Sequence, residues 1–332
     1  MTQAEPVSFS SMPAAPRATY VHDPAEALLR RPGTLALFGF GREATAGTTD
    51  SRFVHVALPG MDDAPLPLEH WHVDAGVAHG RSGEVGWARG GGWLFARIDV
   101  PEAEHGDDIG RCAEHAYRAL CGYLAGQPEG AHVQRVWNYL DRINEGHGDH
   151  ERYKQFCSGR LRGMGDFFDA GFPAATAIGL PVLTGRLSIY CLATEQPGQR
   201  IENPRQWNAW RYPRQYGRTP PSFARAMLLP AADTLAISGT AAITGHESRH
   251  SDDLIAQLTE IRTNIDTLLA QANLPAGLDA NAPLKVYIRH RADAAPVADY
   301  LDRHMPHAPR LLVQGDVCRH ELLVEIDGWR YA

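Results

Sequence analysis

Arginine and tyrosine side chains gather in one stretch of the sequence, residues 135–160, where they could bind an anionic small molecule. The stretch contains Arg152, Tyr153 and Arg160. An arginine guanidinium binds a carboxylate through two parallel hydrogen bonds, and two arginines eight residues apart lie on one face of a helix. The same composition is typical of a charged helix face in water, and composition alone favours that interpretation.

A second stretch, residues 205–226, places Tyr212 and Tyr216 among prolines and glycines, with Arg225 at the start of a predicted strand. Proline and glycine build rigid turns that are not helical. Aromatic and cationic side chains on such an ordered loop suit a planar anionic ring. A structural turn that carries surface arginines explains the composition equally well.

A carboxylate and a thiol lie close together near the end of the chain. Strand alternation over residues 321–329 places Glu325 on the face opposite Val324 and Ile326. Burial would raise the pKa of this glutamate and make it a proton donor near neutral pH. A glutamate on an edge strand that faces water is the alternative. Cys318, taken alone, is more typical of a core thiol than of a functional one.

Two motif matches do not fit their sequence context. Residues 246–250, HESRH, match the HExxH pattern of zinc proteases, which requires both histidines on one face of a helix. Gly245 precedes the run and helical periodicity starts only at Leu254, so we expect no zinc site here. Residues 39–44, GFGREA, resemble a dinucleotide fingerprint, but no apolar helix follows them, so we interpret them as a loop.

Composition restricts the partners and the compartment. The net charge is −7 with no basic run, which argues against nucleic acid. The sequence has no run of 18 apolar residues, so we expect no membrane span. The first 20 residues lack the pattern of a signal peptide. The five cysteines are scattered without a CxxC pair, as free thiols in a reducing compartment would be. We therefore expect a cytoplasmic protein.

Strand and helix patterns must position these residues. Short apolar runs bounded by turn residues alternate with helical patterns, which predicts an α+β (α/β) fold with mixed sheets each packed against helices. Each half of the chain reads as strands, a long helix and further strands, so we predict two related domains. The glycine-rich stretch near residues 145–150 suggests a division into residues 1–148 and 149–332.

The sequence resembles the chorismatase family in four blocks that follow the same order as in that family. The blocks are WNYLDRINEGHGDHERYKQFCSGR, RYPRQYG with PSFARA, SGTAAITGHESRH and DVCRHELLVEIDG, within residues 135–329. Four ordered blocks are far more specific than one short motif. The C-terminal half also resembles the YjgF/RidA fold, through ISGTAA and the VEID of the last strand. The resemblance implies two YjgF/RidA-like domains, the second of which carries most of the active site.

The resemblance also implies roles for particular residues. Glu325 matches the acid that protonates the enolpyruvyl methylene of chorismate. Cys318 matches the cysteine of the branch that releases 3-hydroxybenzoate, where the branch that forms a dihydrodiol has alanine. Gly239 matches the small residue of the aromatising branch. The blocks that line the substrate pocket contain Arg152, Tyr153, Arg160, Tyr212, Tyr216 and Arg225.

The implied activity is cleavage of chorismate to a hydroxybenzoate and pyruvate, without a metal or an organic cofactor. The sequence closely resembles the bifunctional branch of xanthomonadin pigment clusters, which implies that it yields both 3- and 4-hydroxybenzoate. The expected partner is the small molecule chorismate, with no nucleic acid and no membrane, and the expected assembly is a monomer or a small homo-oligomer.

Three alternatives stay open. A chorismatase that forms the dihydrodiol is the alternative within the family. A RidA-like imine or enamine hydrolase would use an arginine placed like Arg310, but it leaves the arginine and tyrosine blocks unexplained. A protein of this fold that senses an aromatic acid without catalysis is the third.

Overall fold

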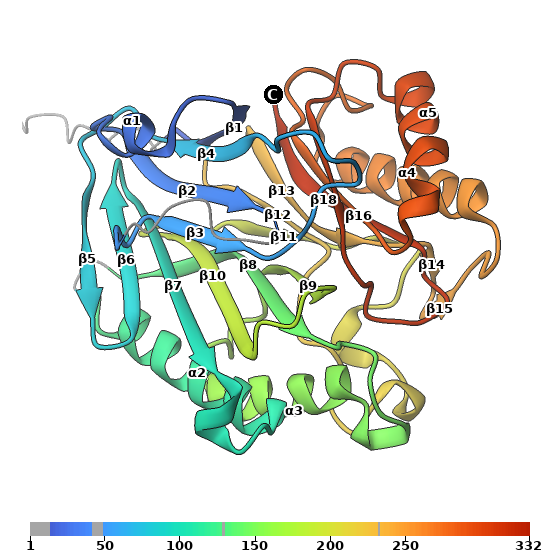
Figure 1. Ribbon diagram of the computed structural model, residues 1–332, viewed down its shortest axis with the longest axis horizontal. Helices are drawn as coiled ribbons and strands as arrows, with labels where there is room; N and C mark the ends of the chain where they lie inside the picture. Colours follow the sequence, from blue (N-terminus) through green and yellow to red (C-terminus); the bar gives the residue numbers. More distant parts are fainter. Residues whose placement is uncertain (1–13, 42–48, 128–129, 232) are drawn as a thin grey trace, which may run out of the picture.

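The computed structural model describes residues 14–41, 49–127, 130–231 and 233–332. Three β-sheets form its framework, and helices cover the outer faces of the two larger ones (Figure 1). The α+β class expected from the sequence is confirmed.

The first large sheet has the strand order β5-β6-β7-β10-β8-β9. Its strands are β5 (Ala78–Ser82), β6 (Val85–Gly90), β7 (Trp93–Pro101), β8 (His132–Asp141), β9 (Ala174–Leu180) and β10 (Arg186–Thr194). Helices α2 (Ile109–Ala125) and α3 (Arg152–Met164) pack on one face of it, below the sheet in Figure 1. Only the pair β8 and β9 is parallel.

The second large sheet repeats this plan with the order β11-β12-β13-β18-β16-β17. Its strands are β11 (Gln199–Ile201), β12 (Ala226–Leu228), β13 (Thr234–Thr240), β16 (Leu284–Ile288), β17 (Arg310–Gln314) and β18 (Val324–Tyr331). Its helices are α4 (Leu254–Gln271) and α5 (Ala294–His304). Again the last pair, β16 and β17, is parallel. The repeat expected from the two halves of the sequence is therefore present as a repeat of topology.

The expected division after residue 148 falls inside the first sheet. Strands β9 and β10 follow that position, and β10 returns to pair with both β7 and β8. Strand pairing between distant segments does not appear in a local pattern, so a glycine-rich loop is a poor guide to the boundary. The strand order starts again between Thr194 and Gln199, and we propose the boundary there.

A smaller sheet near the N-terminus was not predicted. Its order is β1-β4-β2-β3, with β1 (Arg17–Val21), β2 (Thr34–Phe40), β3 (Phe53–Val56) and β4 (Leu68–His72), and the short helix α1 (Ala25–Leu29) packs beside it. The fingerprint-like run at 39–44 begins in β2, and its residues 42–44 lie outside the described residues.

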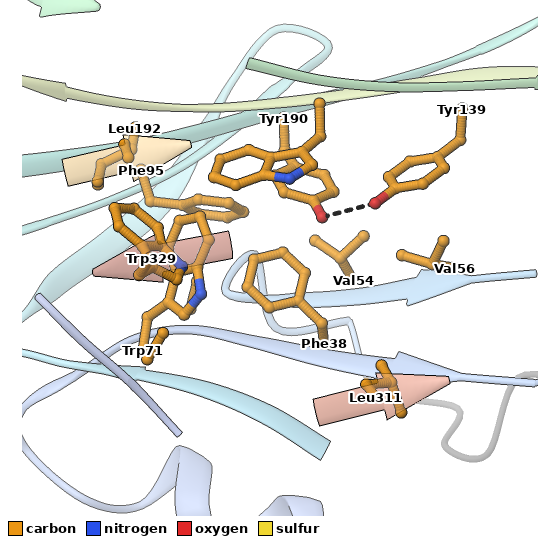
Figure 2. Close-up of a cluster of buried hydrophobic side chains, with 14 of the residues drawn as sticks. Phe38, Val54, Val56, Trp71, Phe95, Tyr139, Tyr190, Leu192, Leu311 and Trp329 are labelled. Carbon is orange, nitrogen blue, oxygen red and sulfur yellow. Dashed lines mark hydrogen bonds between the residues drawn. The ribbon is translucent and has the colours of Figure 1, made fainter. Parts of the chain in front are cut away.

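One aromatic core joins the three sheets. Trp71 of β4 lies 5.2 Å from Trp137 of β8 and 5.6 Å from Trp329 of β18, measured between ring centroids. Figure 2 shows these sheets contributing to one cluster, with Phe38 and Tyr190 also in it. The faces of both large sheets that carry no helix are thus buried against each other and against the N-terminal sheet.

The seam between the two repeated units positions the functional side chains. The start of β9 meets β13 along this seam, where Ala175 N–H donates to Ser238 Oγ at 3.0 Å and Gly239 N–H donates to Thr176 Oγ1 at 2.9 Å. The β13–β18 register shifts between Ile237 and Thr240, which marks a bulge that spans Ser238 and Gly239.

The run at residues 246–250 forms no helix. It lies in and after a short hairpin of β14 (Ile243–Thr244) and β15 (Glu247–Ser248). His250 has a φ of 58°, in the left-handed region. The helical geometry that a zinc protease requires is absent from these residues.

Candidate active site

A cavity opens on the seam between the two repeated units. It holds about 770 Å³ of space free of atoms, a volume that includes open solvent at its mouth. Eight of the nine residues predicted for the site line it: Tyr153, Arg160, Tyr212, Tyr216, Arg225, Gly239, Cys318 and Glu325. Residues as far apart in the sequence as Tyr153 and Glu325, 172 positions, are brought together because β9 and α3 of one unit face β13 and β18 of the other.

Glu325 is the acid of this cavity. It lies in the middle of the second sheet, opposite Tyr287 of β16, and its side chain is only 4% exposed. Burial, with a further contribution from the negative charge of Asp327, raises the pKa of Glu325 to about 8. Glu325 is therefore predominantly a neutral carboxylic acid at pH 7, and it has a proton to donate.

Gly239 provides the space in which the Glu325 carboxyl lies. A Cβ atom at this position would be 1.9 Å from Glu325 Oε1, well inside van der Waals contact. Any larger residue would force the carboxyl to move. The small residue that the resemblance implied at 239 thus has a physical reason in the placement of the acid.

Two arginines bring unsatisfied positive charge to the cavity. Arg160 is 3% exposed, yet its Nε and Nη2 atoms have no hydrogen-bond partner, and the Nε atom of Arg225 has none either. Arg225 Nη2 donates to Tyr212 Oη at 2.7 Å and to the Trp207 carbonyl at 2.8 Å, which fixes its orientation. Buried donors without acceptors are costly, and an anionic ligand would satisfy them.

The segment between β11 and β12 covers part of the cavity with aromatic rings. Its Tyr212 and Tyr216 rings lie 5.3 Å apart, and the guanidinium of Arg319 lies 4.0 Å from the Tyr216 ring centroid. Arg214 of this segment donates both Nη atoms to the Asp149 carboxylate, at 2.8 and 2.6 Å. This ion pair ties the segment to the 3₁₀ turn Gly148–His150 that precedes α3.

Cys318 lies on the loop before β18, where Arg289 organises the backbone. Arg289 donates to the carbonyls of Val317, Arg319 and Leu322, each at 2.9 Å, and pairs with Asp316 at 2.8 Å. Burial, with a further contribution from Glu325, raises the pKa of the Cys318 thiol to about 12. Cys318 is therefore a neutral thiol that can donate a hydrogen bond, and it is a poor nucleophile.

Arg152 does not line the cavity, so its expected role in substrate binding was wrong. Its Nη2 atom donates to both carboxylate oxygens of Glu102, at 2.8 and 2.7 Å, and its Nε donates to the Asp141 carbonyl. Arg152 and Arg160 do lie on one helix, but Arg152 occupies its first turn and points to the turn after β7. It is a structural residue that fastens α3 to the first sheet.

Sequence reasoning missed several polar residues that line the cavity, among them Arg319 and Thr176. Arg319 directly follows Cys318, and this neighbour in the DVCRH block was the available signal. Thr176 lies at the start of an unremarkable apolar strand, and no local pattern distinguishes it. Among the described residues, no group of three or more His, Cys, Asp or Glu side chains is arranged to hold a metal ion. Within the same residues, no helix combines the length and hydropathy of a membrane span.

The fold and the cavity define a class of protein: two repeated sheets with an arginine-lined cavity at their seam and a buried carboxylic acid within it. The model for the N-terminal region of FkbO/Hyg5-like chorismatases matches residues 69–193, and so ends one residue before β10 ends. The 3-hydroxybenzoate synthase of Streptomyces hygroscopicus is 36% identical over 282 residues, which cover 78% of this chain and 80% of that protein. The chain belongs to the chorismatase family.

Two further comparisons agree over most of the chain. A chorismatase of Streptomyces rapamycinicus is 33% identical over 322 residues, covering 87% of this chain and 93% of that protein. A crystal structure of a chorismatase superposes with a TM-score of 0.83 at 29% identity, covering 98% of this chain and all of the other. The smaller RidA of an Antarctic Psychrobacter aligns with 40% of this chain at 19% identity, with a TM-score of 0.31.

Proposed function

We propose that this protein cleaves chorismate to 3-hydroxybenzoate and pyruvate. The observation that carries the proposal is a buried, neutral Glu325 in the same cavity as two arginines with unsatisfied donors. Chorismate has two carboxylates and an enol ether, and an enol ether is cleaved by protonation of its terminal carbon. The names of the relatives, 3-hydroxybenzoate synthase and chorismatase, support the same substrate.

The first step is a proton transfer from the Glu325 carboxyl to the terminal methylene of the enolpyruvyl group. The new C–H bond forms as the O–H bond breaks, and the positive charge develops on the carbon next to the ether oxygen. Such an acid works best when its pKa lies near the working pH. The bond from the ring carbon to the ether oxygen then breaks, and pyruvate leaves.

Ring aromatisation completes the reaction without added water. As the pyruvate leaves, the oxygen of the neighbouring ring hydroxyl forms a bond to the ring carbon that loses the ether oxygen. The bond from this oxygen to its original ring carbon then breaks, so the oxygen ends at the meta position of 3-hydroxybenzoate. The ring loses one proton as it becomes aromatic, and the Glu325 carboxylate accepts a proton to restore the acid. The sum of the two products then equals chorismate in every atom.

The two arginines orient the substrate. Arg225 is held by Tyr212 and the Trp207 carbonyl, so its free Nε has a fixed direction. Arg160 reaches the cavity from α3 of the other unit. A carboxylate at each guanidinium would fix the ring between the two units, which removes much of the entropic barrier.

The neutral thiol of Cys318 and the small Gly239 support the branch that releases 3-hydroxybenzoate over the branch that forms a dihydrodiol. We also propose 4-hydroxybenzoate as a second product, a role in pigment biosynthesis and a cytoplasmic location, on the resemblance and composition alone. Arg310, the arginine that an imine hydrolase would use, pairs with Asp302 and does not line the cavity. This disfavours the hydrolase alternative.

Incubation of the purified protein with chorismate tests the proposal. We expect equimolar pyruvate and hydroxybenzoate, with 3-hydroxybenzoate the main aromatic product by chromatography. A dihydrodiol in its place would move the protein to the hydrolytic branch. Unchanged chorismate would exclude the function, and binding without turnover would favour the sensor alternative.

A further inference from the structure

Behind the cavity lies a buried network of charged side chains. One hydroxyl group connects this network to the backbone segment against which Glu325 lies. Asp327 and Arg135 are fully buried and form an ion pair of 3.2 Å. Asp327 Oδ2 also accepts hydrogen bonds from Trp137 at 2.9 Å and from Tyr287 at 3.0 Å. These groups lie in the core where the three sheets meet, and they do not line the cavity.

Thr176 is the member of this network that does line the cavity, and it is 2% exposed. Its Oγ1 donates to Asp327 Oδ2 at 2.8 Å and accepts one hydrogen bond from Arg135 Nη2 at 2.5 Å and one from Gly239 N–H at 2.9 Å. A hydroxyl has one hydrogen to donate and two lone pairs. All three are used, so the orientation of this hydroxyl is fixed.

The Gly239 contact links the network to the acid. A Cβ at Gly239 would lie 1.9 Å from Glu325 Oε1 and 3.2 Å from Thr176 Oγ1, so both side chains lie over the same glycine. The hydrogen bond from Gly239 N–H to Thr176 joins the β13 bulge to β9. Glu325 therefore lies against a backbone segment whose position depends on Thr176.

The same hydroxyl occupies two donors that would otherwise favour an ionised Glu325. Backbone N–H groups and guanidinium groups that donate to a carboxylate stabilise its charged form. Gly239 N–H and one Arg135 N–H are both directed to Thr176. Among the described residues, none donates a hydrogen bond to the Glu325 carboxyl.

We propose that Thr176 is a positioning residue for Glu325: it holds the Gly239 bulge beneath the carboxyl and keeps the Gly239 and Arg135 donors away from it. The proposal rests on the proposed function for its role in catalysis, although the effect on the acid itself does not. The charged and titratable groups around the Glu325 carboxyl are Asp327, Arg135, Arg225, Arg289, Tyr287, Tyr153, Arg160, Cys318 and Arg319.

The test replaces the hydroxyl and keeps the shape of the side chain, in Thr176→Val. The two freed donors then stabilise the carboxylate, so the pKa of Glu325 falls and the protonated acid is lost at lower pH. In the pH profile of kcat/KM for pyruvate release, we expect the alkaline limb to move to lower pH by about one unit. Thr176→Ser keeps the hydroxyl and should restore the limb.

Ser238→Ala is the matched control. Ser238 Oγ also bridges the seam, because it accepts from Ala175 N–H at 3.0 Å and donates to the Ala224 carbonyl at 2.6 Å, without a contact to the acid. We expect this variant to leave the alkaline limb in place. An equal shift in Ser238→Ala and Thr176→Val would mean that any loosening of the seam has this effect, and would overturn the assignment to Thr176.

Infrared titration of the protonated carboxyl band, with Glu325→Gln to identify the band, needs no turnover. We expect the band to disappear at lower pH in Thr176→Val than in the wild type or in Thr176→Ser. An unchanged titration would overturn the proposal even if pyruvate is released. A shifted titration in a protein that releases no pyruvate would support the proposal and refute the function. If Thr176→Val does not fold, Thr176→Ala carries the same two expectations.

Discussion

At the scale of the residue, Glu325 combines burial with a protonated state near neutral pH. Its carboxyl is almost entirely buried, the negative charge of Asp327 lies on the same strand face, and no described group donates to it. Each of these conditions disfavours the carboxylate form. The arginines of the cavity are oriented toward the space that a ligand would fill, and two of the three already hold other partners.

Glu325→Gln removes the proton donor and keeps the size of the side chain. We expect pyruvate release to fall by about 10²- to 10⁴-fold, the range for loss of a general acid, with an unchanged circular dichroism spectrum. A stopped assay coupled to lactate dehydrogenase measures this rate. Turnover within a few fold of the wild type would remove Glu325 from the mechanism.

Cys318→Ala removes a neutral thiol beside the acid. Because the thiol is a poor nucleophile at this pKa, we expect the rate of chorismate consumption to change little and the products to shift away from 3-hydroxybenzoate. Chromatography of the aromatic products, with Cys157→Ala as the control for another buried thiol, measures the shift. The same product ratio in all three proteins would show that Cys318 does not select the product.

Sequence reasoning placed Glu325 more reliably than it placed the arginines. Alternation in the last strand was sufficient to predict that Glu325 faces away from the helix-covered core formed by Val324 and Ile326. It could not separate Arg152 from Arg160, because composition and helical spacing treat the two alike. Their difference depends on Glu102, a residue of the 3₁₀ turn after β7 that is 50 positions distant from Arg152.

At the scale of the element, α3 has two ends with different tasks. Its first turn is fastened to the sheet by the buried pair of Arg152 and Glu102. Its third turn delivers Arg160 to the cavity, where the guanidinium lies 5.1 Å from the Tyr117 ring centroid and retains unsatisfied donors. Stability and ligand binding should therefore respond to different substitutions on this one helix.

Arg152→Met and Arg160→Met form a matched pair on α3. Arg152→Met leaves the Glu102 carboxylate buried without a partner, and we expect it to lower the free energy of unfolding by about 3–5 kcal/mol. Arg160→Met should raise KM for chorismate about tenfold or more with little loss of stability. Urea unfolding and steady-state kinetics measure both. The reverse pattern would return Arg152 to the substrate site.

At the scale of the whole molecule, three sheets share one core. Trp71, Trp137 and Trp329 come from different sheets and contact one another there. The common plan of elements predicted the two repeated units, but it did not predict that β1 to β4 pair in a separate N-terminal sheet. The short strands of that sheet are separated by long connections, and their pairing is visible only once the chain has folded.

The shared core predicts that the three sheets unfold together. In urea, we expect tryptophan fluorescence and far-ultraviolet circular dichroism to give coincident transitions, since neither large sheet keeps its inner face buried alone. Two separated transitions would show that the units are stable independently. They would also show that the core between the units contributes little to the free energy of unfolding.

The proposed reaction depends most on the transfer of one proton from Glu325 to the enolpyruvyl methylene. Turnover of chorismate in D₂O measures this step directly, with mass spectrometry of the pyruvate after its rapid reduction to lactate. We predict one deuterium in the methyl group of each product molecule, because the Glu325 carboxyl exchanges with the solvent before it donates. Pyruvate whose methyl group carries no deuterium from the solvent would contradict the mechanism.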